Sequence, residues 1–263
     1  MPSKRVAGAQ KAYASNDIEA TKKAHTQAEI KNHRGGSGAE YLGNMVYGAL
    51  DGIVTTFAVV AGAAGAGLNP GVVLVLGFAN LFADGLSMAV GNYLSMKSEQ
   101  SYYEAERKRE EWEVENYPKG ERDEIVEIYR RKGYAGKNLE TLVELITSKK
   151  AVWIDTMMVD ELGLVPDQRS PIKAGLYTYA AFLVAGFVPL LIFVVSILQP
   201  LQPTILFPIA FLLTFATVFA VGSLRSLVIA KHWLAAGFEM LLIGGLTAIV
   251  AYGIGAFIGG FVL

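Results

Sequence analysis

The sequence predicts an all-α integral membrane protein whose five transmembrane helices are interrupted, after the second, by a water-soluble helical domain. Hydrophobic residues make up 52% of the 263 positions, and such a chain is more apolar than a usual soluble domain. Its charges are also segregated. The segment from Lys97 to Ile172 holds 13 Lys and Arg and 17 Asp and Glu, which is 30 of the 47 formal charges. This segregation indicates two solvents, with water around the charged segment and lipid around the rest.

The composition excludes several classes of function. A net charge of -1 argues against a nucleic-acid partner, because binding to phosphates needs a basic face. The absence of cysteine excludes disulfides, iron–sulfur clusters and thiolate metal sites. The three histidines are widely spaced, at His25, His33 and His232. Any metal must therefore be bound by carboxylates, thioethers and carbonyls. We expect this protein to have no organic cofactor and no enzymatic activity.

Five stretches are long and apolar enough to cross a bilayer core of about 30 Å, which needs roughly 20 residues in a helix. The expected spans are Met45–Gly67, Val72–Met96, Ala174–Leu198, Ile205–Ile229 and Leu234–Phe261. The chain then divides into a polar leader (1–40), spans one and two (41–96), a cytosolic helical metal-binding domain (97–172), and spans three to five (173–263). The leader contains no apolar stretch with a cleavage site, so no signal peptide is expected.

The distribution of Lys and Arg predicts the orientation. Seven basic residues lie in the leader, thirteen lie in the charged segment, and Lys231 lies in the turn after span four. The links Leu68–Gly71 and Gln199–Thr204 carry none. We therefore expect the N-terminus, the charged segment and the Lys231 turn in the cytoplasm and the C-terminus outside. A short leader without a sorting signal favours the plasma membrane, with a vacuolar or other organelle membrane as the alternative.

The charged segment itself reads as helical. Its first stretch, Lys97–Glu115, is rich in helix formers and is expected to continue span two without a break until Pro118 and Gly120 interrupt it. A helix over Arg122–Arg131 is expected to end at Gly133. A third region combines Leu139–Thr147 with Ala151–Leu162 and is closed by Gly163 and Pro166. Its apolar positions suffice for a small core.

Three ionisable groups lie inside the expected spans: Asp51, Asp84 and Glu239. A charge within the bilayer costs a few kcal/mol on insertion scales and usually faces a pathway or a partner. Met88 lies one helical turn after Asp84, on the same face. A thioether beside a carboxylate favours a transition metal over magnesium or calcium. The alternative for each acid, most plainly for Glu239, is a single interhelical hydrogen bond.

One chain supplies too few of these groups for a bare dication, which needs about four to six donors. If the glycine-rich faces of spans one and two packed against their two-fold copies, Asp51 and Met88 would be doubled around one axis. Ligand counting thus predicts a homodimer with a pore at its interface.

The charged segment contains acids at helical spacing. Glu106, Glu110 and Glu113 recur at i, i+4 and i+7, and Glu121 and Glu124 repeat the three-residue step. A third set is Met157, Met158 and Glu161. Carboxylates one turn apart are typical of iron and manganese sites in helical bundles. The alternative for any single pair is a solvated face. Met157 and Met158 are expected to be exposed on this water-facing domain, where thioethers add nothing to solubility, and this favours a metal site.

With these residues in hand, the chain resembles the vacuolar iron transporter family of ferrous iron and manganese exporters from about Glu40 to Leu263. The resemblance rests on three stretches, which are GALDGIVTTF at 48–57, LSMAVGNYLSMKSE at 86–99 and WIDTMMVDELG at 153–163. The sequence departs from the family pattern at Asn80, where a further acid is expected. Asp84 supplies a charge one turn later.

The resemblance implies a set of site residues. The pore acid and methionine fall on Asp51 and Met88, with Asp84 nearby. The cytosolic metal ligands fall on Glu110, Glu113, Glu121, Glu124, Met157, Met158 and Glu161. The expected activity is export of Fe(II) or Mn(II) from the cytosol by proton antiport, with Co(II) and Zn(II) as further candidate ions.

Two other functions fit parts of the sequence. A membrane-anchored di-iron carboxylate protein, a ferritin-like store or oxidase, would carry Glu-x-x-His pairs. The segment 97–172 has no histidine, which argues against it. A structural or regulatory membrane protein, whose charged segment binds a protein partner, is the other alternative.

Overall fold

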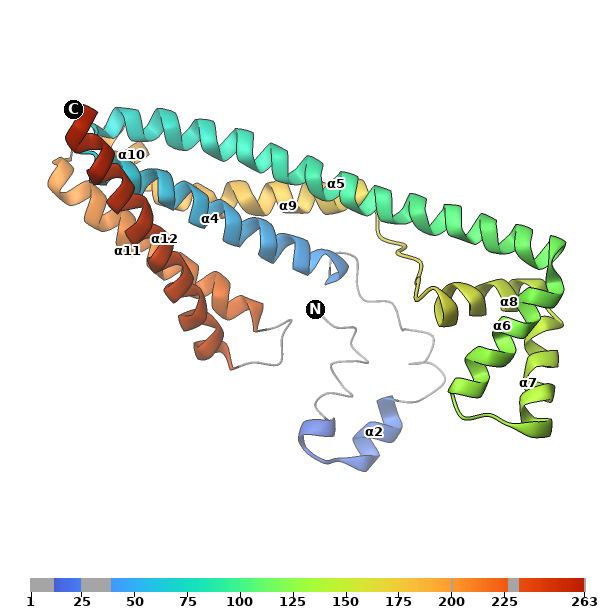
Figure 1. The fold of residues 1–263 in the computed structure, drawn as a ribbon. Coiled ribbons are helices and arrows are strands. Elements are labelled where there is room, and N and C mark those ends of the chain that lie inside the picture. Colours follow the sequence, from blue (N-terminus) through green and yellow to red (C-terminus); the bar gives the residue numbers. More distant parts are fainter. Residues whose placement is uncertain (1–11, 25–38, 200, 227–231, 263) are drawn as a thin grey trace. The chain divides into compact units, whose positions relative to one another are not determined.

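The computed structural model describes residues 12–24, 39–199, 201–226 and 232–262, and every regular element in these ranges is helical (Figure 1). Most of the leader, with His25 and His33, and the Lys231 turn lie outside the described residues. The helices are α2 (Ile18–Ala24), α4 (Leu42–Gly65), α5 (Pro70–Asn116), α6 (Pro118–Arg131), α7 (Gly136–Thr147), α8 (Lys150–Thr156), α9 (Pro171–Gly186), α10 (Val188–Leu198), α11 (Pro203–Arg225) and α12 (Trp233–Val262). Two short elements complete them, a 3₁₀-helix η1 (Ala39–Tyr41) and a π-helix η2 (Met157–Glu161).

The contacts divide the chain into two compact units. The apolar unit comprises residues 1–93 and 170–263, and the insert unit comprises residues 94–169. In the described ranges, the helices α4, α5, α11 and α12 are each long and apolar enough to cross a membrane, and α9 with α10 forms a bent pair. The prediction of an all-helical membrane protein is therefore confirmed.

The third span differs from its prediction as one continuous helix over Ala174–Leu198. It is broken between α9 and α10, which are bent by 53°. The cause is Pro189, which has no N–H to donate to the carbonyl of Ala185 and whose ring crowds that carbonyl. Pro189 lies in the first turn of α10, where a proline costs little.

Span two and the first helix of the charged segment form one helix, as predicted. That helix is α5, with 47 residues, and at 1.5 Å per residue it is about 70 Å long. It ends at Asn116, and Pro118 opens α6. Gly120 lies inside the first turn of α6, so the expectation that it also interrupts the helix is wrong.

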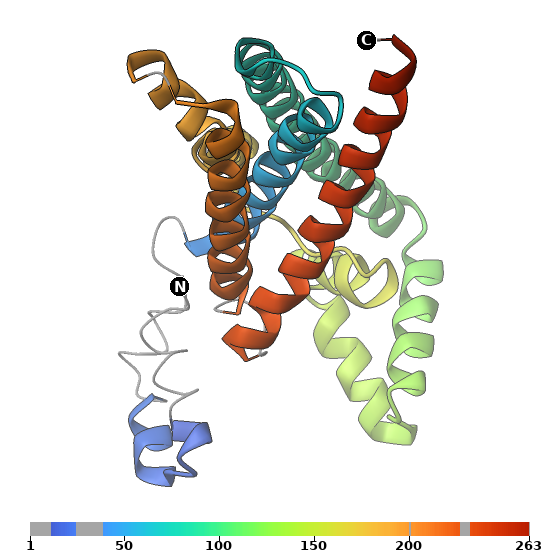
Figure 2. The ribbon, with the colours of Figure 1, turned by 90° about the vertical axis from the view of Figure 1, so that its left-hand side faces the viewer.

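The core of the apolar unit is built around α4, which contacts α9, α11 and α12 (Figure 2). Two glycines bring α4 and α9 close together, because a Cβ on Gly48 or Gly52 would collide with the backbone of Thr178 or Phe182. These glycines pack within the chain. The expectation that they face a two-fold copy is therefore wrong for span one.

The insert unit has a core of its own. Leu139, Val143 and Ile146 on α7 pack with Ile125 on α6 and with residues of α8 and η2. The bounds of α6 confirm the predicted end of that helix, and the backbone then reverses at Gly133, with a φ of +97°. Gly163 likewise ends η2 with a φ of +67°, a conformation in which a Cβ is strained.

The α4–α9 contact can be tested with two matched glycine substitutions. A Cβ on Gly52 would lie 2.5 Å from the carbonyl oxygen of Phe182, whereas one on Gly43, also in α4, would meet nothing within 4 Å. We expect Gly52→Ala to lower the stability of the purified protein by about 1–3 kcal/mol through overpacking. Gly43→Ala should be neutral or slightly stabilising, because alanine favours a helix. Thermal melts in detergent measure both, and equal melting temperatures would contradict the contact.

Candidate metal centre

Three glutamates of the insert unit bring their carboxylates together. Glu110, Glu113 and Glu121 each offer one oxygen, and these oxygens lie within 4.8 Å of one another. The first two share a face of α5 because they are three residues apart. The chain reverses at Tyr117, and Glu121 lies in the first turn of α6. The short turn thus returns a third carboxylate to the face of α5.

Two of these carboxylates are buried and have oxygens that accept no hydrogen bond within the described residues. Glu110 is 1% exposed and Glu121 is 5% exposed. Both oxygens of Glu110 and one oxygen of Glu121 accept no hydrogen bond within the described residues. A buried carboxylate with unused lone pairs is costly. Carboxylate oxygens are the ligands that hard and borderline dications prefer, so Glu110, Glu113 and Glu121 are candidate metal ligands.

The electrostatics extend the cluster to Glu124 and Glu161. Besides loss of water, the charge of Glu124 is one of the causes that raise the pKa of Glu121 and of Glu161. Loss of water and then the neighbouring acids raise the pKa of Glu121 to about 7. The pKa of Glu161 is raised to about 7 by the same causes. Burial also raises the pKa of Glu110, against the charge of Arg109. The structure therefore gathers all five predicted glutamates into one electrostatic group.

The methionines lie in a different environment from the one we expected. Met157 and Met158 are fully buried and belong to the core of the insert unit, beside Ile125 and Val143. The expectation of exposed thioethers is wrong, because these side chains already serve a packing role. Their assignment as metal ligands stays a prediction.

A π-helical turn holds Met157, Met158 and Glu161. The N–H of Leu162 donates to the carbonyl of Met157 at 3.2 Å, across five residues. Asp160 ties this turn to α6, because Lys132 pairs with it at 2.6 Å and the hydroxyl of Tyr129 donates to it at 3.2 Å. Such turns are frequent at functional sites.

Arg109 is a member of the cluster that the glutamate pattern alone does not reveal. Its guanidinium lies 3.0 Å from Glu106 and 2.7 Å from Glu110, and it also pairs with Glu113. The spacing contains the signal, since Glu106 and Glu113 lie three residues before and four after Arg109 and such positions meet on a helix.

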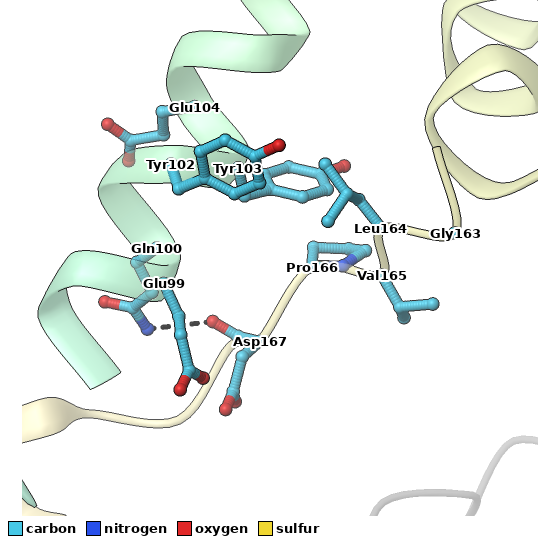
Figure 3. Close-up of a pocket in the computed structure, with 10 residues that line it drawn as sticks. All are labelled: Glu99, Gln100, Tyr102, Tyr103, Glu104, Gly163, Leu164, Val165, Pro166 and Asp167. Atoms are coloured by element: carbon cyan, nitrogen blue, oxygen red, sulfur yellow. Dashed lines mark hydrogen bonds between the residues drawn. The ribbon is translucent and has the colours of Figure 1, made fainter. Parts of the chain in front are cut away.

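The insert unit also contains a cavity of about 570 Å³ between α5 and the segment 163–167 (Figure 3). Gln100 holds that segment by donating hydrogen bonds of 2.8 Å to the carbonyls of Asp167 and Arg169. Glu99 and Glu104 line the cavity together with Asp167, whose carboxylate is bound by the guanidinium of Arg169 at 2.6 Å. None of the predicted metal ligands lines this cavity.

The acids of the apolar unit are brought to one level by a hydrogen bond between α4 and α5. The amide of Asn80 donates to the hydroxyl of Thr55 at 3.5 Å. Asp51 lies one turn before Thr55 and Asp84 one turn after Asn80, so antiparallel helices place the two acids at the same depth. Their charges interact. Met88, half-buried, lies one turn further along α5.

Glu239 lies in a different environment from Asp51 and Asp84. It lies 3.7 Å from the guanidinium of Arg225, so a charge near the start of α12 is balanced by one at the end of α11. The pairing fits the alternative of a structural contact for this residue.

The fold and these sites define a class, an all-helical membrane protein with a candidate cation centre. Residues 42–256 match the VIT family. The chain is 37% identical to "Vacuolar iron transporter" of Toxoplasma gondii, over 94% of this chain and 86% of that protein. It is 32% identical to "Vacuolar iron transporter" of Plasmodium falciparum, over 97% of both chains. "Vacuolar iron transporter 1" of Arabidopsis thaliana is 29% identical over 81% of this chain and 84% of its own length. The chain belongs to the VIT family, as the resemblance predicted.

The raised pKa values predict how the metal-free insert unit responds to pH. The folded state keeps protons on Glu121 and Glu161 above their ordinary pKa of 4.5. The stability that these two carboxyl groups contribute is therefore fully present below about pH 4.5 and is lost as the pH rises through about 7. Hydrogen–deuterium exchange of α6, corrected for intrinsic rates, should be faster at pH 8 than at pH 6.

Glu121→Gln should weaken this dependence and leave the part that Glu161 contributes. Glu127→Gln is the matched control on the same helix, because hydrogen bonds from Arg131 and Arg130 lower the pKa of Glu127 and leave it ionised throughout this range. A parental protein whose exchange in α6 is the same at both pH values would contradict the prediction.

Proposed function

We propose that this protein exports Fe(II) or Mn(II) from the cytosol in exchange for protons. The observation that carries the proposal is the pair of buried carboxylates, Glu110 and Glu121, with unsatisfied oxygens. The names of the relatives support iron as the transported ion. Those names also favour the vacuolar membrane, the alternative location, over the plasma membrane.

The glutamate cluster would act as a cytosolic collecting site. Acids concentrated in one place raise the local concentration of cations. Glu110, Glu113 and Glu121 would supply the first oxygens, and Glu124 and Glu161 the next. Metal displaces protons from such groups, so pKa values near 7 make capture and release responsive to small changes in pH.

Asp51 would be the group that couples metal to protons in the membrane. It is half-buried, and its charge interacts with that of Asp84. A dication between them would relieve that repulsion, with the thioether of Met88 one turn away as a softer ligand. A proton arriving from the far side competes for the same lone pair on Asp51 and releases the ion.

A second copy of the chain would complete the pore. The exposed face of α5 presents small residues at four-residue intervals, beside exposed apolar side chains; the small residues are Ala79, Ala83, Ser87 and Gly91. Small residues let membrane helices approach closely. Asp84 and Met88 border this face, so a dimer that paired two copies of α5 there would bring together two carboxylates and two thioethers, one of each from each copy.

Transport through Asp51 is testable in proteoliposomes. With an acidic pH on the side opposite the insert unit, the parental protein should move Fe(II) toward the acid. Asp51→Asn should lower the rate at least tenfold, because the amide neither binds the dication well nor exchanges a proton. Asp155→Asn is the control, since it removes an exposed carboxylate that pairs with Arg107. Equal rates for Asp51→Asn and the parent would refute the role of Asp51.

The dimer can be tested by cross-linking, because the chain has no cysteine. We expect Ser87→Cys, on the exposed face of α5, to form a disulfide-linked dimer on mild oxidation in membranes. Leu242→Cys is the control, since Leu242 is 76% exposed on α12 and lies outside the proposed face. Dimer formation that is stronger at Leu242 than at Ser87 would assign the interface elsewhere.

A further inference from the structure

Arg109 has a position that the proposed function does not explain. It projects a positive charge into the group of acids that is proposed to collect cations, where it contacts Glu106, Glu110 and Glu113. A cation fixed at a cation-binding site opposes binding by electrostatic repulsion.

The three contacts of Arg109 differ in quality. Its N–H groups donate aligned hydrogen bonds to Glu106 and Glu113. Toward Glu110 the distance is 2.7 Å, yet neither oxygen of Glu110 has a hydrogen bond. The guanidinium thus neutralises the charge of Glu110 without satisfying its lone pairs. A metal ion could do both.

Arg109 is also able to leave. Its side chain is 41% exposed, so the guanidinium can return to water without opening the core. Glu110 is the buried partner and stays in place. Exchange of an exposed guanidinium for a dication at a fixed carboxylate needs only a side-chain rotation.

The neighbouring Arg107 shows that this placement is specific to one position. Arg107 lies on the same helix but pairs with Asp155 at 2.6 Å and with Glu111 at 3.7 Å. None of the five clustered glutamates is among these partners. The two arginines therefore have similar chemistry and different surroundings, which makes Arg107 a matched control.

We propose that Arg109 is the counter-ion of the glutamate cluster when no metal is bound and is displaced when a dication binds. This inference rests on the proposed function, because it assigns Arg109 a regulatory role at the same glutamates. The guanidinium stabilises the metal-free cluster and so lowers the affinity for metal. A site that passes its ion onward needs a limited affinity for that ion, since the ion must be able to leave.

The test measures Mn(II) binding to the full-length protein in detergent at pH 8, by the electron paramagnetic resonance signal of free Mn(II). We expect Arg109→Met to bind about tenfold more tightly than the parent, within the usual range for coupling between neighbouring charges. Arg109→Lys, which keeps the charge, and Arg107→Met should stay within about threefold of the parent. Arg109→Gln repeats the measurement if the methionine variant is misfolded.

A second readout separates a counter-ion from a merely structural residue. Without metal, Arg109→Met should melt at a lower temperature than the parent, and Mn(II) should raise its melting temperature by more than it raises that of the parent. Unchanged or weaker binding by Arg109→Met and Arg109→Gln would overturn the inference. An equal gain in affinity for Arg107→Met would overturn it too, since the effect would then be one of general charge. A parental protein that binds no Mn(II) would instead refute the metal centre itself.

Discussion

Negative charge held out of water is the constraint on which the insert unit depends. Glu110 and Glu121 are almost inaccessible to solvent, and carboxylates in that position repel one another and lose their hydration. The chain reduces the resulting cost in two ways. The pKa of Glu121 is raised to about 7, so part of the cluster carries protons up to neutral pH, and Arg109 adds a positive charge. In the proposed metal centre a dication would replace both, and the two oxygens of Glu110 without hydrogen bonds would be available to bind it.

The sequence was sufficient for those parts of the fold that depend on composition and periodicity. Charge segregation separated water-exposed from membrane-spanning segments, and the helix formers after Met96 predicted the continuous α5. Glycine and proline marked most of the helix ends, because they act through local backbone geometry. The break before α10 was missed although Pro189 was visible, since a proline in an apolar stretch kinks some helices and interrupts others according to what packs against it.

Within the candidate site, spacing predicted neighbours on one helix better than contacts between helices. The step from Glu110 to Glu113 placed two acids on one face of α5, whereas the approach of Glu121 depends on the turn at Tyr117. The spacing of residues in the sequence could not predict how deeply each side chain is buried. Met157 and Met158 looked solvent-facing in a charged domain, but the domain is large enough to have its own core, and they fill it. The position of Arg109 was not predicted for a related reason, because the pattern of glutamates does not include the cation that lies among them.

The contact between α4 and α9 has a mechanical consequence. Gly52 lies against the backbone of Phe182, and Gly186 lies against that of Gly52, so the two helices touch main chain to main chain. Two helices packed at this short distance cannot slide past each other without steric collision. In the proposed exporter, a change of access from one side to the other would therefore move α4 and α9 as one rigid body, and the bend that follows α9 would be the place for a hinge.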